Sequence, residues 1–162
     1  MKKLNKRGFT LVELLAVIAI LAILMLLVMP NILGMFTRGR EDAFVTEAQS
    51  LWKAAEQKYV TDSIGGTTPG PYCKNSGITT GCTEISGIST SFKYYIDFDT
   101  TTGTIKTFNL MDNNFNIVNA NNIDFKNSKD ADGNALVKSN GSNKVLKCTS
   151  SNGTVTCAVS AS

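Results

Sequence analysis

Residues 8–30 read GFTLVELLAVIAILAILMLLVMP, and no other segment of the 162-residue chain restricts the fold as strongly. Every residue from Leu14 to Met29 is apolar, and no charge occurs between Leu14 and Thr37. A run of about 20 apolar residues is long enough to cross the bilayer core as a helix. Four basic residues precede this run, and by the positive-inside rule they keep the N-terminus in the cytoplasm. The sequence therefore predicts a chain anchored by one membrane helix, with the remainder outside.

Three other interpretations of this segment fit the residues less well. A buried core helix is disfavoured because so small a domain can hardly surround a rod that is hydrophobic on all faces. A cleaved secretory signal needs a small-x-small exit site, and no clear one follows Val28. A plain signal anchor does not explain Glu13, a carboxylate one residue before the apolar run. Charges in membrane segments are costly and usually functional, so Glu13 needs a specific explanation.

The segment Lys6-Arg7-Gly8-Phe9-Thr10-Leu11-Val12-Glu13-Leu14 resembles the class III signal of type IV pilins and pseudopilins. In that family a short basic leader ends in glycine, the mature chain begins with phenylalanine or a similar residue, and a glutamate stands fifth. Gly8, Phe9 and Glu13 occupy those positions, and Pro30 stands where the family commonly has a proline. The resemblance covers about the first 60 residues, and the rest agrees only in its general plan.

The resemblance implies how the junction between Gly8 and Phe9 is processed. A prepilin peptidase, which is a membrane aspartyl protease, would remove residues 1–8 as a leader and methylate the new amino group of Phe9. The missing side chain of Gly8 lets a protease approach the bond closely. An ATPase-driven assembly platform would then draw the subunit from the membrane into an extracellular filament of identical copies. A pseudopilin of a type II secretion or competence system shares this signal and is the alternative.

Glu13 is expected to set the register of assembly. Cleavage creates an ammonium group at Phe9, and this group on an adjacent subunit would offset the cost of burying the Glu13 carboxylate among apolar helices. The alternative is a carboxylate that is merely tolerated near the lipid headgroups.

Pro30 is predicted to bend or loosen the helix. It removes an amide donor and disfavours helical backbone at Met29, and Gly34 adds freedom nearby. In filaments of the resembling family, the segment before this proline is often unwound, which implies the same here. A kink that only fits local packing is the alternative.

Charge and composition argue against catalysis and nucleic-acid binding. The leader holds four of the 16 basic residues, so the other 12 oppose 13 acidic residues and the mature chain has a net charge of −1. No basic track for nucleic acid remains. The chain has no histidine, which is the commonest general base and metal ligand. We therefore expect no catalytic residue, no cofactor and no metal site, with a membrane-tethered enzyme as the disfavoured alternative.

One acidic stretch, residues 130–134, has oxygen side chains at alternate positions, as calcium loops do. No glutamate follows at the offset that such loops require. The sequence therefore predicts a solvated turn.

Beyond the apolar segment of residues 9–37, the chain predicts an α+β fold in which a long N-terminal helix packs on a small antiparallel sheet. Apolar residues over 38–64 recur at steps of three and four, as in an amphipathic helix. They are Phe44, Ala48, Leu51, Trp52, Ala55 and Tyr59. Residues 65–91 predict a stapled loop, and residues 92–162 predict the antiparallel sheet and a C-terminal hairpin.

Four cysteines lie in the part of the chain predicted to be outside the cell, where disulfides persist. A two-residue turn at Asn152-Gly153 would place Cys148 opposite Cys157 in a non-hydrogen-bonded pair, with Cα atoms about 4.5 Å apart. Such a pair can be bridged, which leaves Cys73 for Cys82. Two alternatives remain. Zinc is disfavoured by the spacing, and the resemblance allows a bridge that ties the C-terminal segment to the sheet.

Overall fold

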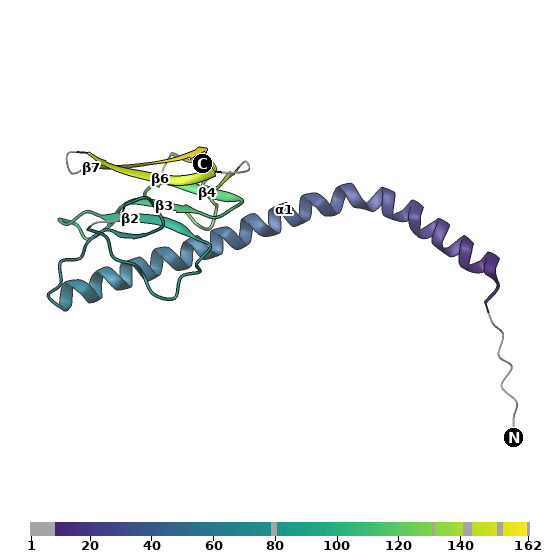
Figure 1. Cartoon of the computed structure of the whole chain (residues 1–162), viewed down its shortest axis with the longest axis horizontal. Coiled ribbons are helices and arrows are strands. Elements are labelled where there is room, and N and C mark those ends of the chain that lie inside the picture. Colours follow the sequence, from purple (N-terminus) through teal and green to yellow (C-terminus); the bar gives the residue numbers. More distant parts are fainter. Residues whose placement is uncertain (1–8, 79–80, 131, 141–143, 152–153, 162) are drawn as a thin grey trace, which may run out of the picture. The chain divides into compact units, whose positions relative to one another are not determined.

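The computed structural model describes residues 9–78, 81–130, 132–140, 144–151 and 154–161. The fold is α+β, with a long N-terminal helix, α1, that spans Leu11–Ile64 and seven strands that follow it (Figure 1). The chain divides into two compact units, Met1–Arg40 and Glu41–Ser162, so that α1 contributes to both.

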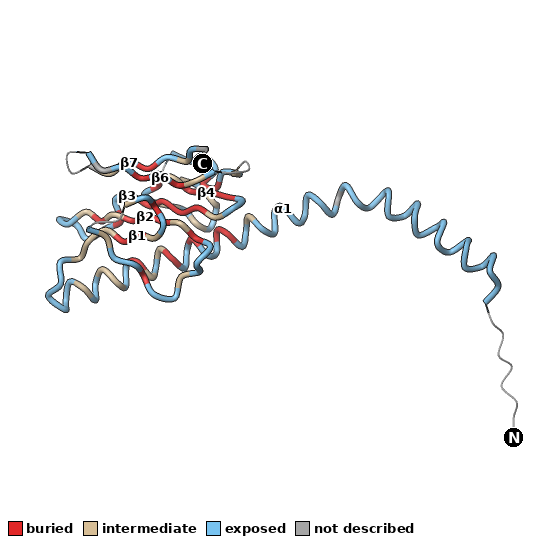
Figure 2. The backbone as a smooth tube through the Cα atoms, in the orientation of Figure 1, coloured by how far each residue is buried: buried red, intermediate tan, exposed pale blue. Residues whose placement is uncertain are grey.

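In the first unit, α1 has no protein core around it. The large apolar side chains from Phe9 to Phe36 are all exposed, and this part of the tube in Figure 2 is pale blue throughout. The stretch Leu11–Pro30 is long and apolar enough to cross a membrane, judged by its length and composition. A helix that is apolar on every face requires lipid or other helices around it.

In the second unit, α1 is amphipathic and packs on a sheet, as predicted. Its buried residues follow helical spacing and join the main hydrophobic core; they are Phe44, Val45, Ala48, Leu51 and Ala55. Trp52 and Tyr59 are partly buried at the margin of this core, and the Tyr59 ring stacks on Phe98 with ring centroids 4.3 Å apart. The opposite face, which includes Thr46, Ser50 and Gln57, is exposed.

The five strands of the main sheet follow one another in chain order, and each pair is antiparallel. The strands are β1 (Tyr72–Lys74), β2 (Lys93–Phe98), β3 (Ile105–Met111), β4 (Phe115–Ala120) and β5 (Lys138–Ser139). Because side chains alternate along a strand, Tyr94 and Ile96 of β2 join the core under α1, whereas Tyr95 joins a second cluster on the other face.

Strands β6 (Lys144–Ser151) and β7 (Thr154–Ala161) form a separate two-stranded sheet. This hairpin covers the face of the main sheet that α1 leaves free, which gives the layers visible in Figure 1. Leu146, Cys148 and Cys157 from the hairpin pack with Tyr95 and Met111 from the sheet. The second unit is therefore a helix, a five-stranded sheet and a hairpin stacked in that order.

Two details differ from the sequence prediction. The segment 65–91 contains a strand, β1, which pairs with β2 from Tyr72 to Lys74. Three residues are too few to show an alternating pattern, so the sequence alone could not separate this strand from a loop. The apolar segment was predicted over residues 9–37, but the helix itself begins at Leu11, because Thr10 caps it there.

Asp62, near the end of α1, connects the helix to strand β1 of the sheet. Its carboxylate pairs with Lys58 and accepts a hydrogen bond of 2.9 Å from the Tyr72 hydroxyl of β1. These two contacts, with Lys58 the larger, hold the pKa of Asp62 below its ordinary value. Burial and the neighbouring Asp62 carboxylate raise the pKa of the Tyr72 hydroxyl, so Tyr72 stays a neutral donor.

We expect Asp62→Asn to lower the melting temperature at neutral pH and to have little effect in acid. A carboxylate whose folded pKa lies below the unfolded value of about 3.9 stabilises the fold above that value, and the stabilisation is lost as the pH falls through the folded pKa. Thermal melts of both proteins between pH 7 and pH 2 measure this. A constant difference in melting temperature across the whole range would contradict the prediction, because Asn cannot titrate.

Candidate functional site

The helix start around Glu13 forms a reciprocal cap. The Thr10 amide and the Thr10 hydroxyl each donate to Oε2 of Glu13 over 2.9 Å, and the Glu13 amide donates to the Thr10 hydroxyl over 3.3 Å. The Leu14 amide donates to the Thr10 carbonyl over 3.2 Å. This is a capping box, in which Thr10 is the N-cap and Glu13 the third helical residue.

The cap gives Glu13 a role inside its own chain. A helix start leaves amide groups without partners, and a carboxylate there satisfies them and suits the positive end of the helix dipole. Both hydrogen bonds to the Glu13 side chain use Oε2. Within the described residues, Oε1 accepts no hydrogen bond, so one carboxylate oxygen remains free for a second partner.

Thr10 was not identified as a functional residue from the sequence, although a signal for it was present. The order Thr-x-x-Glu over residues 10–13, directly before an apolar run, is the signature of a capping box. The charge of Glu13 and its place in the signal mark this residue in the sequence, and its spacing from Thr10 marks the cap.

The predicted cleavage junction lies just before the cap. Phe9 has non-helical backbone, and its side chain is 87% exposed. Gly8 falls outside the described residues. Because α1 starts at Leu11, the Phe9 side of the predicted junction lies outside the helix.

Pro30 lies inside α1, and the helix assignment continues across it from Leu11 to Ile64. A side chain added at Gly34 would meet nothing within 4 Å. The predicted bend or loosening of the helix at Pro30 and Gly34 remains a prediction.

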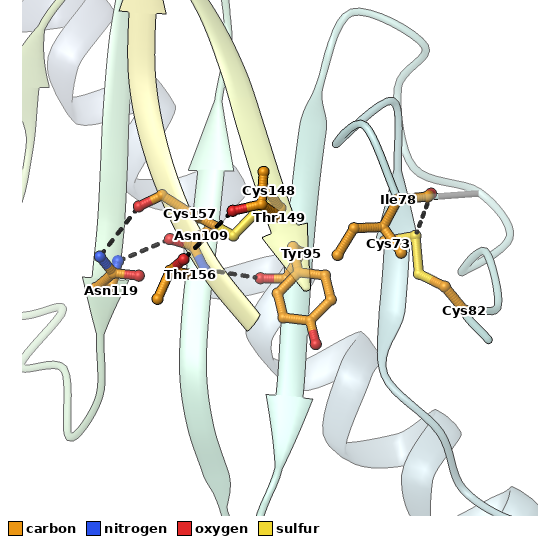
Figure 3. The surroundings of a disulfide bond; sticks show 10 residues. All are labelled: Cys73, Ile78, Cys82, Tyr95, Asn109, Asn119, Cys148, Thr149, Thr156 and Cys157. Carbon is orange, nitrogen blue, oxygen red and sulfur yellow. Dashed lines mark hydrogen bonds between the residues drawn. A yellow bond between two sulfur atoms is a disulfide. The ribbon is translucent and has the colours of Figure 1, made fainter. Parts of the chain in front are cut away.

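The cysteines lie in two pairs at disulfide distance, Cys73 with Cys82 and Cys148 with Cys157 (Figure 3). The Cα atoms are 5.8 Å apart in the first pair and 4.0 Å apart in the second. These are the predicted partners. Sulfurs of both pairs pack in the cluster between the main sheet and the hairpin.

The register of the hairpin agrees with the prediction. Ser151 pairs with Thr154 and Cys148 with Cys157. The Cys148 amide donates to the Ser76 carbonyl over 2.8 Å, and the Cys157 carbonyl accepts from the Asn119 side chain over 3.2 Å. Both groups point away from the partner strand, as they do in a non-hydrogen-bonded pair. The predicted turn at 152–153 lies outside the described residues.

Tyr95 lies between the two cysteine pairs in Figure 3 and is 2% exposed. Burial, with a smaller contribution from Asp97, raises the pKa of the Tyr95 hydroxyl to about 12. The ring therefore acts as neutral packing between the sheet and the hairpin.

The described residues of the acidic stretch, Asp130 and residues 132–134, are hydrogen-bonded to one another. Oδ1 of Asp130 accepts the amides of Asp132 and Asn134 over 3.0 and 2.8 Å. These contacts, with Asn134 the largest, hold the pKa of Asp130 below its ordinary value. Among the residues that the structure describes, no group of three or more Cys, Asp or Glu side chains could hold a metal ion.

The comparison with protein families identifies the N-terminal segment. The family model of the prokaryotic N-terminal methylation motif matches residues 3–29. No curated protein and no solved structure matches the chain. The matched segment contains most of the predicted leader, the predicted junction, the capping box and most of the apolar span. Together with the apolar helix, this motif fits a membrane-anchored precursor of the type IV pilin or pseudopilin kind and points to a structural rather than an enzymatic role.

Proposed function

We propose that the chain is the precursor of a type IV pilus subunit. In this proposal prepilin peptidase cuts between Gly8 and Phe9 and methylates Phe9, and the mature subunit assembles through α1 into an extracellular filament. The observation that carries the proposal is the methylation motif at residues 3–29, which ends in a helix with exposed apolar side chains. The assembly ATPase and its platform are the implied partners.

The exposed apolar side chains of the first unit support assembly through α1. Nothing in the described chain covers the apolar side chains between Leu11 and Phe36, so lipid would cover them before assembly and other copies of α1 afterwards. Helices that leave lipid for one another gain packing contacts but little hydrophobic free energy. A specific polar contact is therefore needed to select one register.

Glu13 is suited to supply that contact. Within its own chain, the carboxylate accepts hydrogen bonds from the Thr10 amide and hydroxyl at Oε2. After cleavage the ammonium of Phe9 on an adjacent subunit would bind the free oxygen, Oε1. An ion pair among apolar helices fixes their register. In any other register the Glu13 carboxylate and the Phe9 ammonium would both be left unpaired in an apolar bundle.

We favour a pilin over a pseudopilin because of the second unit. Two cysteine pairs and a hairpin stacked on the sheet stiffen a domain that would stand outside the cell. A short periplasmic pseudopilus has less need of such bracing. Electron microscopy of sheared material distinguishes the two: long extracellular filaments composed mainly of this chain support the pilin, and their absence at native expression supports the pseudopilin.

The sharpest test of processing is the mature N-terminus. We expect mass spectrometry of the assembled or membrane-bound protein to find a chain that starts at Phe9 and carries one methyl group on its amino nitrogen. The same preparation from cells without prepilin peptidase should retain residues 1–8. A mature chain that starts elsewhere, or an unprocessed chain in peptidase-positive cells, would contradict the proposal.

A further inference from the structure

Two opposite charges follow the end of the apolar segment. Arg38 is the first charged residue after the run that begins at Leu14, and Asp42 follows four positions later. Both residues lie in α1, and both side chains are exposed. Within the described residues, the ion pairs are Lys58–Asp62 and Lys74–Glu84, so neither Arg38 nor Asp42 is paired in its own chain.

The same arrangement of charges occurs at the start of the mature chain. Cleavage would give Phe9 a positive charge, and Glu13 follows four positions later. In both places a positive group precedes a carboxylate by four residues. If Phe9 and Glu13 pair between two copies, the axial shift that this pairing imposes also applies to Arg38 and Asp42.

The axial shift between neighbouring subunits decides which residues of the two copies lie at the same level. If Glu13 of one subunit meets Phe9 of its neighbour, the neighbour is displaced outward by about 6 to 10 Å, which corresponds to four residues that are partly helical and partly extended. Identical subunits related by symmetry have the same axial displacement at every level. Asp42 of the first subunit then lies close to the level of Arg38 of the neighbour, and the long arginine side chain spans the remaining few ångströms.

We propose that Arg38 of one subunit and Asp42 of a second copy form an ion pair that locks the outer end of the apolar helices in register. The partner is a second copy of this chain, and the charge complementarity at the shared four-residue spacing argues for it. This inference rests on the proposed pilus function. It extends the proposed register contact from the cytoplasmic end of the apolar helix to its outer end.

The chain supplies matched controls in the same part of α1. Four residues beyond Arg40 stands Phe44, which is buried in the core. Four residues before Glu47 stands Ala43, which carries no charge. A displacement of four helical residues therefore gives Arg40 and Glu47 no oppositely charged partner. Only a displacement of about seven residues, roughly 10 Å, would bring Arg40 of one copy to Glu47 of another, and loss of filaments in these two variants would overturn the Arg38–Asp42 pairing in favour of that one.

Charge reversal tests the pair. We expect Arg38→Asp and Asp42→Arg each to reduce the amount of sheared filament at least about tenfold, because like charges then face each other between copies. The combined variant, Arg38→Asp with Asp42→Arg, should restore filaments. Arg40→Asp and Glu47→Arg change charge equally and should leave filament yield near that of the wild type. All five variants should insert into the membrane and start at Phe9.

Cysteine cross-linking separates a pair between copies from one within a chain. Filaments that contain Arg38→Cys and Asp42→Cys subunits together should yield cross-linked dimers with a bifunctional thiol reagent about as long as an arginine side chain, and filaments with either variant alone should not. Failure of the combined reversal to recover filaments, or absence of dimers in mixed filaments, overturns this inference alone. Wild-type cells that lack both filaments and a methylated Phe9 overturn the proposed function as well.

Discussion

Replacement of Glu13 by leucine is expected to abolish filaments while membrane insertion and cleavage continue. The Phe9 ammonium of each subunit would then be buried in an apolar bundle without a counter-charge, which is strongly unfavourable. The amount of assembled filament should fall at least about a hundredfold. Immunoblots of membrane and sheared fractions, with mass spectrometry of the N-terminus, measure assembly and processing in the same cells.

Two further variants separate the charge of Glu13 from its cap. Glu13→Gln keeps an acceptor for the Thr10 amide but removes the charge, so it should also fail to assemble. Thr10→Ala removes the capping hydroxyl but keeps the charge, so it should retain filaments. Normal assembly of the Gln variant would show that the capping box, and not an ion pair, accounts for Glu13.

Removal of the bridge in the C-terminal hairpin should cause the largest loss of stability in the second unit. Cys148 and Cys157 close a loop of ten residues, and the chain-entropy model values such a bridge at about 2.5–3 kcal/mol. For a unit of this size the double variant Cys148→Ser with Cys157→Ser should melt roughly 10 °C lower. Circular dichroism of the full chain in detergent measures the transition.

The other cysteine pair is a matched control, because Cys73 and Cys82 have the same sequence separation of nine. The entropy gained by the unfolded chain is therefore the same for both double variants. Cys148 and Cys157 are 4% and 5% exposed, whereas Cys82 is only partly buried, so the hairpin variant also places two hydroxyls in a core. A larger loss from Cys73→Ser with Cys82→Ser, or a peptide map that joins Cys73 to Cys148 or Cys157, would contradict this assignment.

Features set by neighbouring residues could be predicted from the sequence. Helical spacing identified the buried face of α1 at Phe44, Ala48 and Leu51, and it is buried in the structure. A two-residue turn was enough to place Cys148 opposite Cys157, because a hairpin register is fixed by its turn. The Thr10 cap could also have been predicted, since its signal is four residues long. Strand β1 could not, because its three residues acquire their role only by pairing with β2.

The sequence by itself determined the long apolar helix, the N-terminal methylation motif, the amphipathic face of α1 and the partners in the cysteine pairs. Only the tertiary structure decided that the hairpin of β6 and β7 covers the face of the main sheet opposite α1. That placement depends on contacts between distant residues: the Cys148 amide with the Ser76 carbonyl, and the Asn119 side chain with the Cys157 carbonyl. Periodicity shows which side chains share a face, but it carries no information on which faces meet, because that choice depends on burial and hydrogen bonding summed over the whole fold.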